Sequence, residues 1–260
     1  MRDIRHRGLG LPWMRVEPRD CFLASWPRSG NTWLRHIIYF YTTGISDLDM
    51  TTLDSFCPII DGIELKQHLL KMEDQEHRFI KSHELCAPYL LNGRIVYLVR
   101  DGRDATWSYY KYRLGRRHHS PSDFDSFLRL CLNDKIRYYS WHRNVSSWLK
   151  YKHNPSMLLL RFEDMRADPK GTFVSILDHL DIPIDLERVD ASVALATPDR
   201  VNSTFRSEVG ARLGRGDGVG HGGLVERWRE VYTREQLDMF EDKAGDVLRS
   251  LGYRTSMDVV

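Results

Sequence analysis

The stretch that most restricts the fold is CFLASWPRSGNTWLRHIIYFY, residues 21–41. It opens with the short apolar run CFLAS, which is typical of a buried β-strand. A polar loop with a glycine at position 30 follows, and the segment 32–41 then has the apolar face of a helix. A strand, a short polar loop and a helix in direct succession are typical of folds in which helices cover a parallel sheet.

The rest of the chain repeats this alternation of short apolar runs and amphipathic segments. The clearest strand is RIVYLVR at 94–100, which follows the turn signal Asn92-Gly93. We expect further strands at 78–83 and 156–164, loops with short helices at 47–64, one or two helices within 123–152, and helices at 101–113, 168–182 and 233–253. This order predicts an α/β fold with a central, mostly parallel sheet flanked by helices.

Length and charge limit the domain organisation and the class of partner. With 260 residues, we expect a single domain over 1–260, with an N-terminal extension at 1–19 and a core at 20–253. The net charge of +2 argues against a nucleic-acid partner, so an anion site has to be local. The basic N-terminus lacks a signal-peptide pattern, and no run of about 18 apolar residues suggests a membrane span. We therefore predict a cytoplasmic protein.

The four cysteines suggest neither a disulfide framework nor a metal site. Cys21, Cys57, Cys86 and Cys131 are scattered and form no CxxC pair. We expect reduced, mostly buried thiols and no bound metal.

Three predicted strands end in polar clusters, at residues 28–30, 81–83 and 100–103. Ligands bind outside the carboxyl ends of the strands in open parallel sheets, so we expect these clusters to line one crevice. Around the first cluster, Gly30 permits the backbone to approach an anion closely, and Ser29 and Thr32 supply hydroxyls. Arg28 supplies a planar, positively charged guanidinium group. The plainer alternative is a strand–helix turn with a surface arginine.

The cluster at 100–103 resembles a second phosphate site. Arg100 ends a strand, and Ser108 lies eight residues later, about two helical turns away. An arginine here binds a phosphate bidentately, or it forms an ordinary structural ion pair.

Four segments resemble the sulfotransferases that use 3′-phosphoadenylyl sulfate (PAPS). SWPRSGNTW at 25–33 is similar to the family's 5′-phosphosulfate loop, and IVYLVRDGRDATWSYYKY at 95–112 is similar to its 3′-phosphate segment. The segments at 140–165 and 222–233 resemble its adenine-contacting and C-terminal stretches. The similarity runs over about residues 20–253 and is nearest the cytosolic branch that acts on small molecules.

This resemblance implies a PAPS site with a loop like a nucleotide-binding P-loop. Ser29, Gly30, Asn31 and Thr32 would hold the 5′-phosphate, while Arg28 would contact the oxygen that bridges phosphate and sulfate. The remaining implied contacts are Trp33 and Phe162 to adenine and Arg100 and Ser108 to the 3′-phosphate.

The resemblance also implies the catalytic base. Lys81-Ser82-His83 matches a Lys-Thr-His triplet of the family, so His83 would take the proton from the acceptor hydroxyl and Lys81 would stabilise charge. Imidazole suits this task because its ordinary pKa lies near neutral pH. The reaction would be in-line sulfuryl transfer to an alcohol or phenol, without a metal.

The chain departs from the family pattern at several positions. Arg28 replaces a lysine, and Phe162 replaces a tyrosine. Where the family has Arg-Lys-Gly for the 3′-phosphate, this chain has His221-Gly222-Gly223, and Arg212 or Arg215 is the alternative contact. The family's dimer motif is matched only in part, by Arg229, Thr233, Arg234 and Asp238, which leaves a homodimer open.

Two other functions remain as alternatives at this stage. A P-loop kinase or phosphotransferase would need GxxxxGK[ST], which residues 25–33 do not contain. A catalytically silent nucleotide-binding protein would keep the pocket without the chemistry.

By analogy with the family, the acceptor-facing parts are 45–75 and 113–140. The basic run at 111–119 is either a solvated face, a site for an acidic acceptor or a lid.

Overall fold

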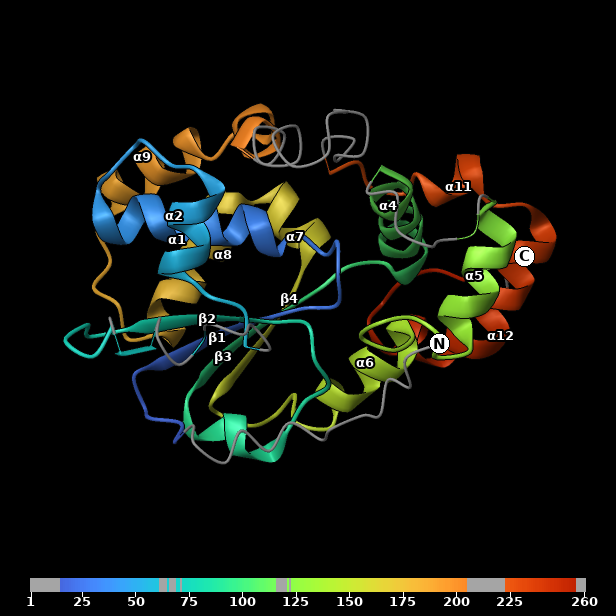
Figure 1. Ribbon diagram of the computed structural model, residues 1–260, viewed down its shortest axis with the longest axis horizontal. Helices are drawn as coiled ribbons and strands as arrows, with labels where there is room; N and C mark the ends of the chain where they lie inside the picture. The colour runs from blue at the N-terminus through green and yellow to red at the C-terminus, as the bar shows by residue number, and fades with distance from the viewer. Residues whose placement is uncertain are drawn as a thin grey trace.

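The structure is a computed structural model that describes residues 15–60, 65, 69–70, 72–115, 121, 123–204 and 223–255. Its centre is a four-stranded sheet with the spatial order β2-β1-β3-β4 (Figure 1). The strands are β1 (Asp20–Ala24), β2 (Arg78–Ser82), β3 (Arg94–Val99) and β4 (Met157–Arg161). Each neighbouring pair is parallel, which confirms the predicted parallel sheet.

The side chains of the strands alternate between two hydrophobic cores, one on each face of the sheet. In β1, Cys21 and Leu23 enter one core, and Phe22 and Ala24 enter the other. This alternation follows from the two-residue period of a strand, and burial on both faces explains the continuous apolar run.

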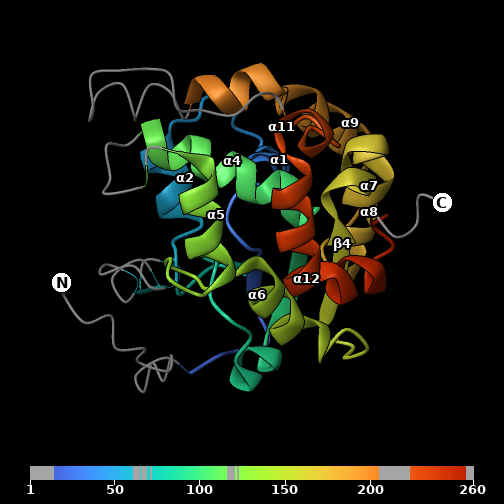
Figure 2. The same cartoon turned by 90° about the vertical axis from the view of Figure 1, so that its right-hand side faces the viewer.

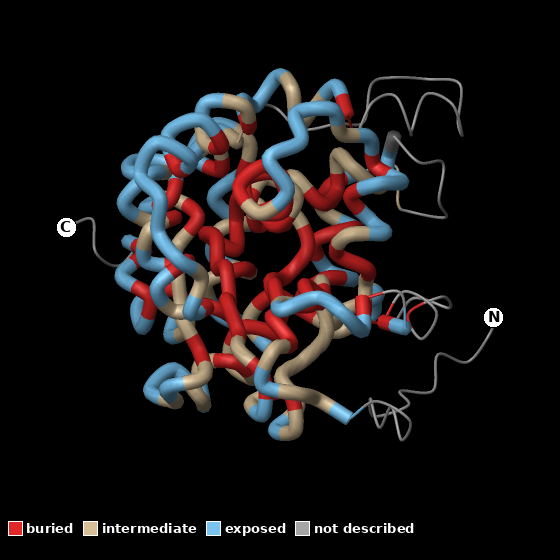
Figure 3. Tube along the Cα trace, turned by 90° about the vertical axis from the view of Figure 1, so that its left-hand side faces the viewer, coloured by how far each residue is buried: buried red, intermediate tan, exposed pale blue. Residues whose placement is uncertain are grey.

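Helices cover both faces (Figures 1 and 2). On the Cys21 side lie α1 (Asn31–Thr43), α2 (Met50–Phe56), α7 (Phe162–Ala167), α8 (Pro169–His179) and α9 (Leu186–Leu195). On the Phe22 side lie the 3-10 helix η1 (Pro88–Asn92), α4 (Gly102–Gly115), α5 (Phe124–Leu132), α6 (Trp141–Leu149), α11 (Trp228–Val231) and α12 (Arg234–Ser250). Buried residues are concentrated at the centre, and exposed ones lie on the outer helices (Figure 3).

Most of the long helices are capped by a side chain, whereas α1 is not. Thr233 caps α12, forming a reciprocal capping box with Gln236. Side-chain caps also begin α2, α5, α6, α8 and α9, at Asp49, Asp123, Ser140, Asp168 and Asp185. By contrast, the N-cap residue of α1 is Gly30, which has φ 96° and no side chain. The first N–H groups of α1 are therefore left for another acceptor.

The structure corrects the predicted strand at 156–164. β4 ends at Arg161, and Phe162 begins the short helix α7. Glu163 and Asp164 occupy the first turn of α7, where the positive end of the helix dipole favours acidic residues. No element was predicted for α9, which begins shortly after Pro183.

Two further expectations concern the cysteines and membrane spans. All four cysteines are free thiols. Within the described ranges, we find no helix with the length and apolar character that crossing a membrane requires.

Candidate active site

One cavity of about 400 Å³ lies at the carboxyl ends of the strands, and all three polar clusters line it. Arg28 comes from the loop after β1, Lys81 and His83 from the end of β2, and Arg100 from the end of β3. Phe162, at the end of β4, completes this wall. The convergence expected from parallel neighbouring strands is therefore confirmed.

The loop before α1 has the features of an anion site. Gly30 is required because a Cβ on it would lie 2.5 Å from Cδ2 of Phe162, and its φ is +96°. Next to it, the Ser29 hydroxyl and the Asn31 Oδ1 are buried without a hydrogen-bond partner. Asn31 is fixed by the bond from its Nδ2 to the Leu23 carbonyl, at 2.8 Å. Buried polar groups without partners, beside an uncapped helix N-terminus, fit a bound phosphate.

Arg28 and Arg100 belong to one hydrogen-bonded unit. Arg28 Nε donates to the Ser108 hydroxyl at 3.2 Å, and Arg100 Nη1 donates to the Arg28 carbonyl at 3.1 Å. Arg100 Nη2 also donates to the Leu224 carbonyl at 2.7 Å. The structure thus joins the two segments that the sequence predicts to bind phosphate.

An aromatic wall lies next to this unit. The rings of Trp33 and Phe162 meet edge to face at 6.1 Å, and Trp33 Nε1 donates to the Ala196 carbonyl at 2.9 Å. The Arg100 guanidinium lies 4.8 Å from the centre of the Phe162 ring. Gly223 lines the cavity, with a Cβ position 3.0 Å from Phe162. Gly222, Arg215, His221 and Arg212 lie outside the described residues.

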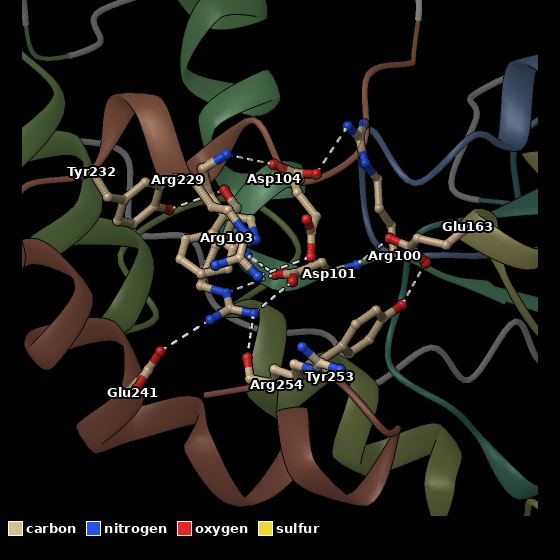
Figure 4. Close-up of polar contacts among 12 residues, drawn as sticks. Arg100, Asp101, Arg103, Asp104, Glu163, Arg229, Tyr232, Glu241, Tyr253 and Arg254 are labelled. Atoms are coloured by element: carbon tan, nitrogen blue, oxygen red, sulfur yellow. Dashed lines mark hydrogen bonds and ion pairs between the residues drawn. The ribbon is translucent and has the colours of Figure 1, made fainter. Parts of the chain in front are cut away.

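A buried network holds the chain segment that follows Arg100 (Figure 4). Arg103 donates to Asp101 at 2.7 Å and to Glu241 of α12 at 3.0 Å. Its guanidinium lies 3.7 Å from the Trp228 ring centre, and the Trp228 N–H donates to Asp104 at 2.8 Å. Asp101 and Asp104 therefore anchor the C-terminal helices behind the segment that is predicted to hold the 3′-phosphate.

His83 is held in the tautomer of a base. Its Nδ1 lies 2.8 Å from the Ser25 carbonyl oxygen, and because a carbonyl only accepts, Nδ1 carries the proton. The lone pair of Nε2 is then available. Burial, together with the positive charge of Lys81, lowers the pKa of His83 well below its usual value near 6.5. His83 is therefore neutral at physiological pH and ready to accept a proton.

This pKa shift predicts the titration of His83 in the donor-free protein. Because the pKa is depressed, the ring takes up its second proton and becomes imidazolium only in acid. It is neutral at every pH above 6.5. NMR of the carbon-labelled imidazole, assigned with His83→Gln, should show a midpoint well below 6.5. Adding the anionic product adenosine 3′,5′-bisphosphate (PAP) should raise the midpoint, since a nearby negative charge favours imidazolium. A midpoint at or above 6.5 in the free protein would contradict the described environment.

The cavity contains residues that the sequence analysis did not assign. The charged ones are Asp104, Arg113, Arg137, Arg166 and Arg227, and Tyr138 is among the others. Burial raises the pKa of Asp104 to about 6, although Arg100 acts in the opposite direction. Arg113 lies within the basic run at 111–119, and Tyr138 lies in an aromatic-rich segment, so both had a sequence signal. Arg227 lies in the family-like segment 222–233 but was not singled out, and Arg166 carried no pattern that distinguished it from a surface arginine.

In the part of the chain that the structure describes, no group of three or more His, Cys, Asp or Glu side chains is arranged to hold a metal ion.

Comparisons with known proteins agree with this geometry. The sulfotransferase domain family matches residues 18–250. Sulfotransferase 1A1 of Bos taurus is 29% identical over 255 residues, which cover 86% of this chain and 81% of that protein. Sulfotransferase 4A1 of Homo sapiens is 27% identical over 237 residues, which cover 87% of this chain and 79% of that protein.

A solved structure also shares the fold. The crystal structure of retinol dehydratase, in complex with androsterone and the inactive cofactor PAP, superposes with a TM-score of 0.76. The match covers 94% of this chain and 84% of that one at 20% identity, so it speaks for the fold alone.

Proposed function

The chain belongs to the sulfotransferase domain family, and on that basis we propose how its own residues carry out the reaction. As a member of the family, it is a PAPS-dependent sulfotransferase that moves a sulfuryl group to a small-molecule acceptor. One observation carries the residue assignments: a neutral His83 and an uncapped anion loop line the same cavity.

The residues of the first loop fit the phosphosulfate of PAPS. Buried groups without partners, at Ser29 and Asn31, lie beside the free N–H groups of α1, and Gly30 keeps the backbone open. In our assignment Ser29 to Thr32 hold the 5′-phosphate, and Arg28 reaches the bridging oxygen.

The other half of the donor site is assigned to the aromatic wall and the second arginine. Trp33 and Phe162 would contact adenine, and Arg100 and Ser108 would hold the 3′-phosphate. The cavity position of these residues and the bonds that join Ser108, Arg28 and Arg100 support this. The loss of the tyrosine hydroxyl at position 162 leaves an apolar face, which still suits a purine ring.

The proposed chemistry is a single in-line displacement. The acceptor oxygen forms a bond to sulfur as its proton passes to Nε2 of His83. The bond from sulfur to the bridging oxygen breaks, and its electron pair stays on the phosphate of the leaving PAP. Arg28, Lys81 and the backbone N–H groups of α1 stabilise the charge that develops there.

The acceptor, the cellular location and the oligomeric state are assigned in less detail than the donor site. We propose a hydroxyl acceptor, an alcohol or phenol, because His83 is placed to remove a proton. Cytoplasmic location and a homodimer remain predictions. The kinase alternative is excluded because the chain belongs to the sulfotransferase domain family. A catalytically silent binding protein is the other alternative, and a transfer assay distinguishes it from an active enzyme.

A transfer assay tests this function. We expect the purified protein to move label from sulfur-35 PAPS to members of a panel of phenols, alcohols and sugars, and to do so in the presence of EDTA. Metal independence follows from positive side chains that neutralise the leaving group. Tight binding of PAP without turnover on any acceptor would establish the silent binding protein instead.

A further inference from the structure

The cavity carries more positive charge than the donor needs. Among its described lining residues are seven arginine and lysine side chains and one carboxylate, Asp104. Asp104 is already engaged, by the Trp228 N–H at 2.8 Å and by Arg100 at 3.7 Å. PAPS carries about four negative charges at neutral pH, since a phosphate monoester supplies close to two. Counted over these lining residues and the donor alone, about two positive charges remain.

Two further arginines lie near the residues assigned to the donor. Arg166 lies 5.7 Å from the ring centre of Trp33, on the adenine side, and Arg227 follows the segment that contacts Arg100. The remaining two, Arg113 and Arg137, line the cavity together with Tyr109, Tyr112 and Tyr138. We therefore assign the remaining positive charge to the end of the cavity that Arg113 and Arg137 line. This end is bounded by aromatic side chains and not by the anion loop before α1.

Arg137 stands next to the catalytic base. Its guanidinium lies 4.9 Å from the ring centre of Tyr138, and that ring lies edge to face with His83 at 5.3 Å. The positive charge of Arg137 also contributes to the lowered pKa of His83, after burial and Lys81. A negative group that meets Arg137 is therefore within one small molecule's length of the base.

The backbone that presents Arg137 is strained and held in place. Tyr138 and Tyr139 are consecutive non-glycine residues with φ of 73° and 63°. Such positions cost about 1–3 kcal/mol each and cluster at functional sites. The Trp26 Nε1 donates to the Tyr139 carbonyl at 3.2 Å, and the Asp134 carboxylate accepts from the Ser140 N–H at 2.8 Å. These bonds fix the loop against the donor side of the cavity.

Arg113 approaches from the last turn of α4. Its Nε is buried without a hydrogen-bond partner. The rest of its guanidinium interacts with the Tyr109 hydroxyl through charge and a hydrogen bond, and the Tyr109 ring stacks on Tyr112 at 6.3 Å with an interplanar angle of 23°. Arg113 thus has an unfulfilled donor at an aromatic wall, and an unfulfilled buried donor points to a ligand acceptor.

We propose that the acceptor is an aromatic hydroxy acid, whose ring lies against these tyrosines and whose carboxylate binds Arg113 and Arg137. The inference rests on the proposed function and names the substrate class of the same site. Planar guanidinium groups match a carboxylate, and the tyrosine rings match an aryl ring. The basic run at 111–119 therefore contributes a specificity residue, the acidic-acceptor alternative weighed from the sequence.

Two matched acceptors test this class. 4-Hydroxyphenylacetate and 4-hydroxyphenylacetamide have the same shape and the same reacting phenol, but only the first is charged. For the native enzyme we expect kcat/KM to favour the carboxylate by about tenfold or more, which is the usual weight of a charge-assisted contact. In the double variant Arg113→Gln/Arg137→Gln the ratio should fall to about one, mainly through the KM of the carboxylate.

Several variants keep the result readable. The dissociation constant of PAP should stay within about twofold in the double variant, because neither arginine is assigned to the donor, and this shows that the donor site is folded. Arg137→Lys keeps the charge and should keep most of the preference. Arg129→Gln, on the exposed side of α5, should leave the ratio unchanged.

The opposing results are distinct. Equal use of the two acceptors by the native enzyme, or a ratio that survives the double substitution, would overturn the inference. A raised KM for PAPS with an unchanged acceptor ratio would overturn it too, because the surplus charge would then serve the donor. If no acceptor of the wider panel is sulfated, the proposed function fails and the inference fails with it.

Discussion

The variant His83→Gln is expected to lower kcat by about 10²- to 10⁴-fold, the usual contribution of a general base. Glutamine keeps much of the volume and can still bond the Ser25 carbonyl, but it offers no basic nitrogen. The acceptor proton then has no recipient as the bond to sulfur forms. The measurement is steady-state transfer from labelled PAPS to the best phenol of the panel at saturating donor.

Binding of PAP separates this loss from a folding defect. Its dissociation constant should change by no more than about twofold, because His83 is assigned to the acceptor proton and makes no contact in the proposed donor site. His153→Gln is the matched control: this histidine is exposed in the turn between α6 and β4 and lies away from the cavity. A His83→Gln enzyme with native kcat would disprove the base assignment and leave family and fold untouched.

The parallel sheet was predictable because the two central strands, β1 and β3, are buried on both faces. Burial on both faces appears in the sequence as the unbroken apolar runs CFLAS and RIVYLVR. The polar residues that follow these runs predicted where the cavity lies. The end of β4 was placed wrongly because Phe162 continues the apolar run. Only the tertiary structure shows that the Phe162 ring packs onto Gly30, where it leaves no room for a Cβ.

The acceptor end was much less predictable. Its residues come from the end of α4 and the loop before α6, and their approach depends on how these segments pack. Two consecutive tyrosines with positive φ are against the ordinary preference of such residues, so no local rule would place Arg137 beside His83. The network of Arg103 was equally hidden, since its partners Asp101, Glu241 and Trp228 are spread over the sequence.

The variant Arg28→Met is expected to lower kcat by about 10²- to 10³-fold, comparable to the removal of a preorganised charge-stabilising donor in other enzymes. Arg28 lies at φ 66°, a strained position for any residue with a Cβ. Methionine shares that strain with arginine, so a comparison of the two isolates the guanidinium. Since the positive charge matters most as the bridging oxygen becomes negative, kcat should fall more than the affinity for PAPS.

A second substitution, Arg28→Lys, addresses the departure from the family pattern. Lysine restores the charge but loses the Nε bond to the Ser108 hydroxyl that now joins the two phosphate segments at 3.2 Å. We expect kcat to recover to within about tenfold of the native value, a difference of ~1.4 kcal/mol in the barrier. Full recovery would show that charge alone is needed. Equal losses for lysine and methionine would show that the geometry of the guanidinium group is required.

One outcome would contradict the role of Arg28. If Arg28→Met lowers PAP affinity and kcat/KM by the same factor, Arg28 stabilises the bound donor and the transition state equally, and its assignment to the leaving group is wrong.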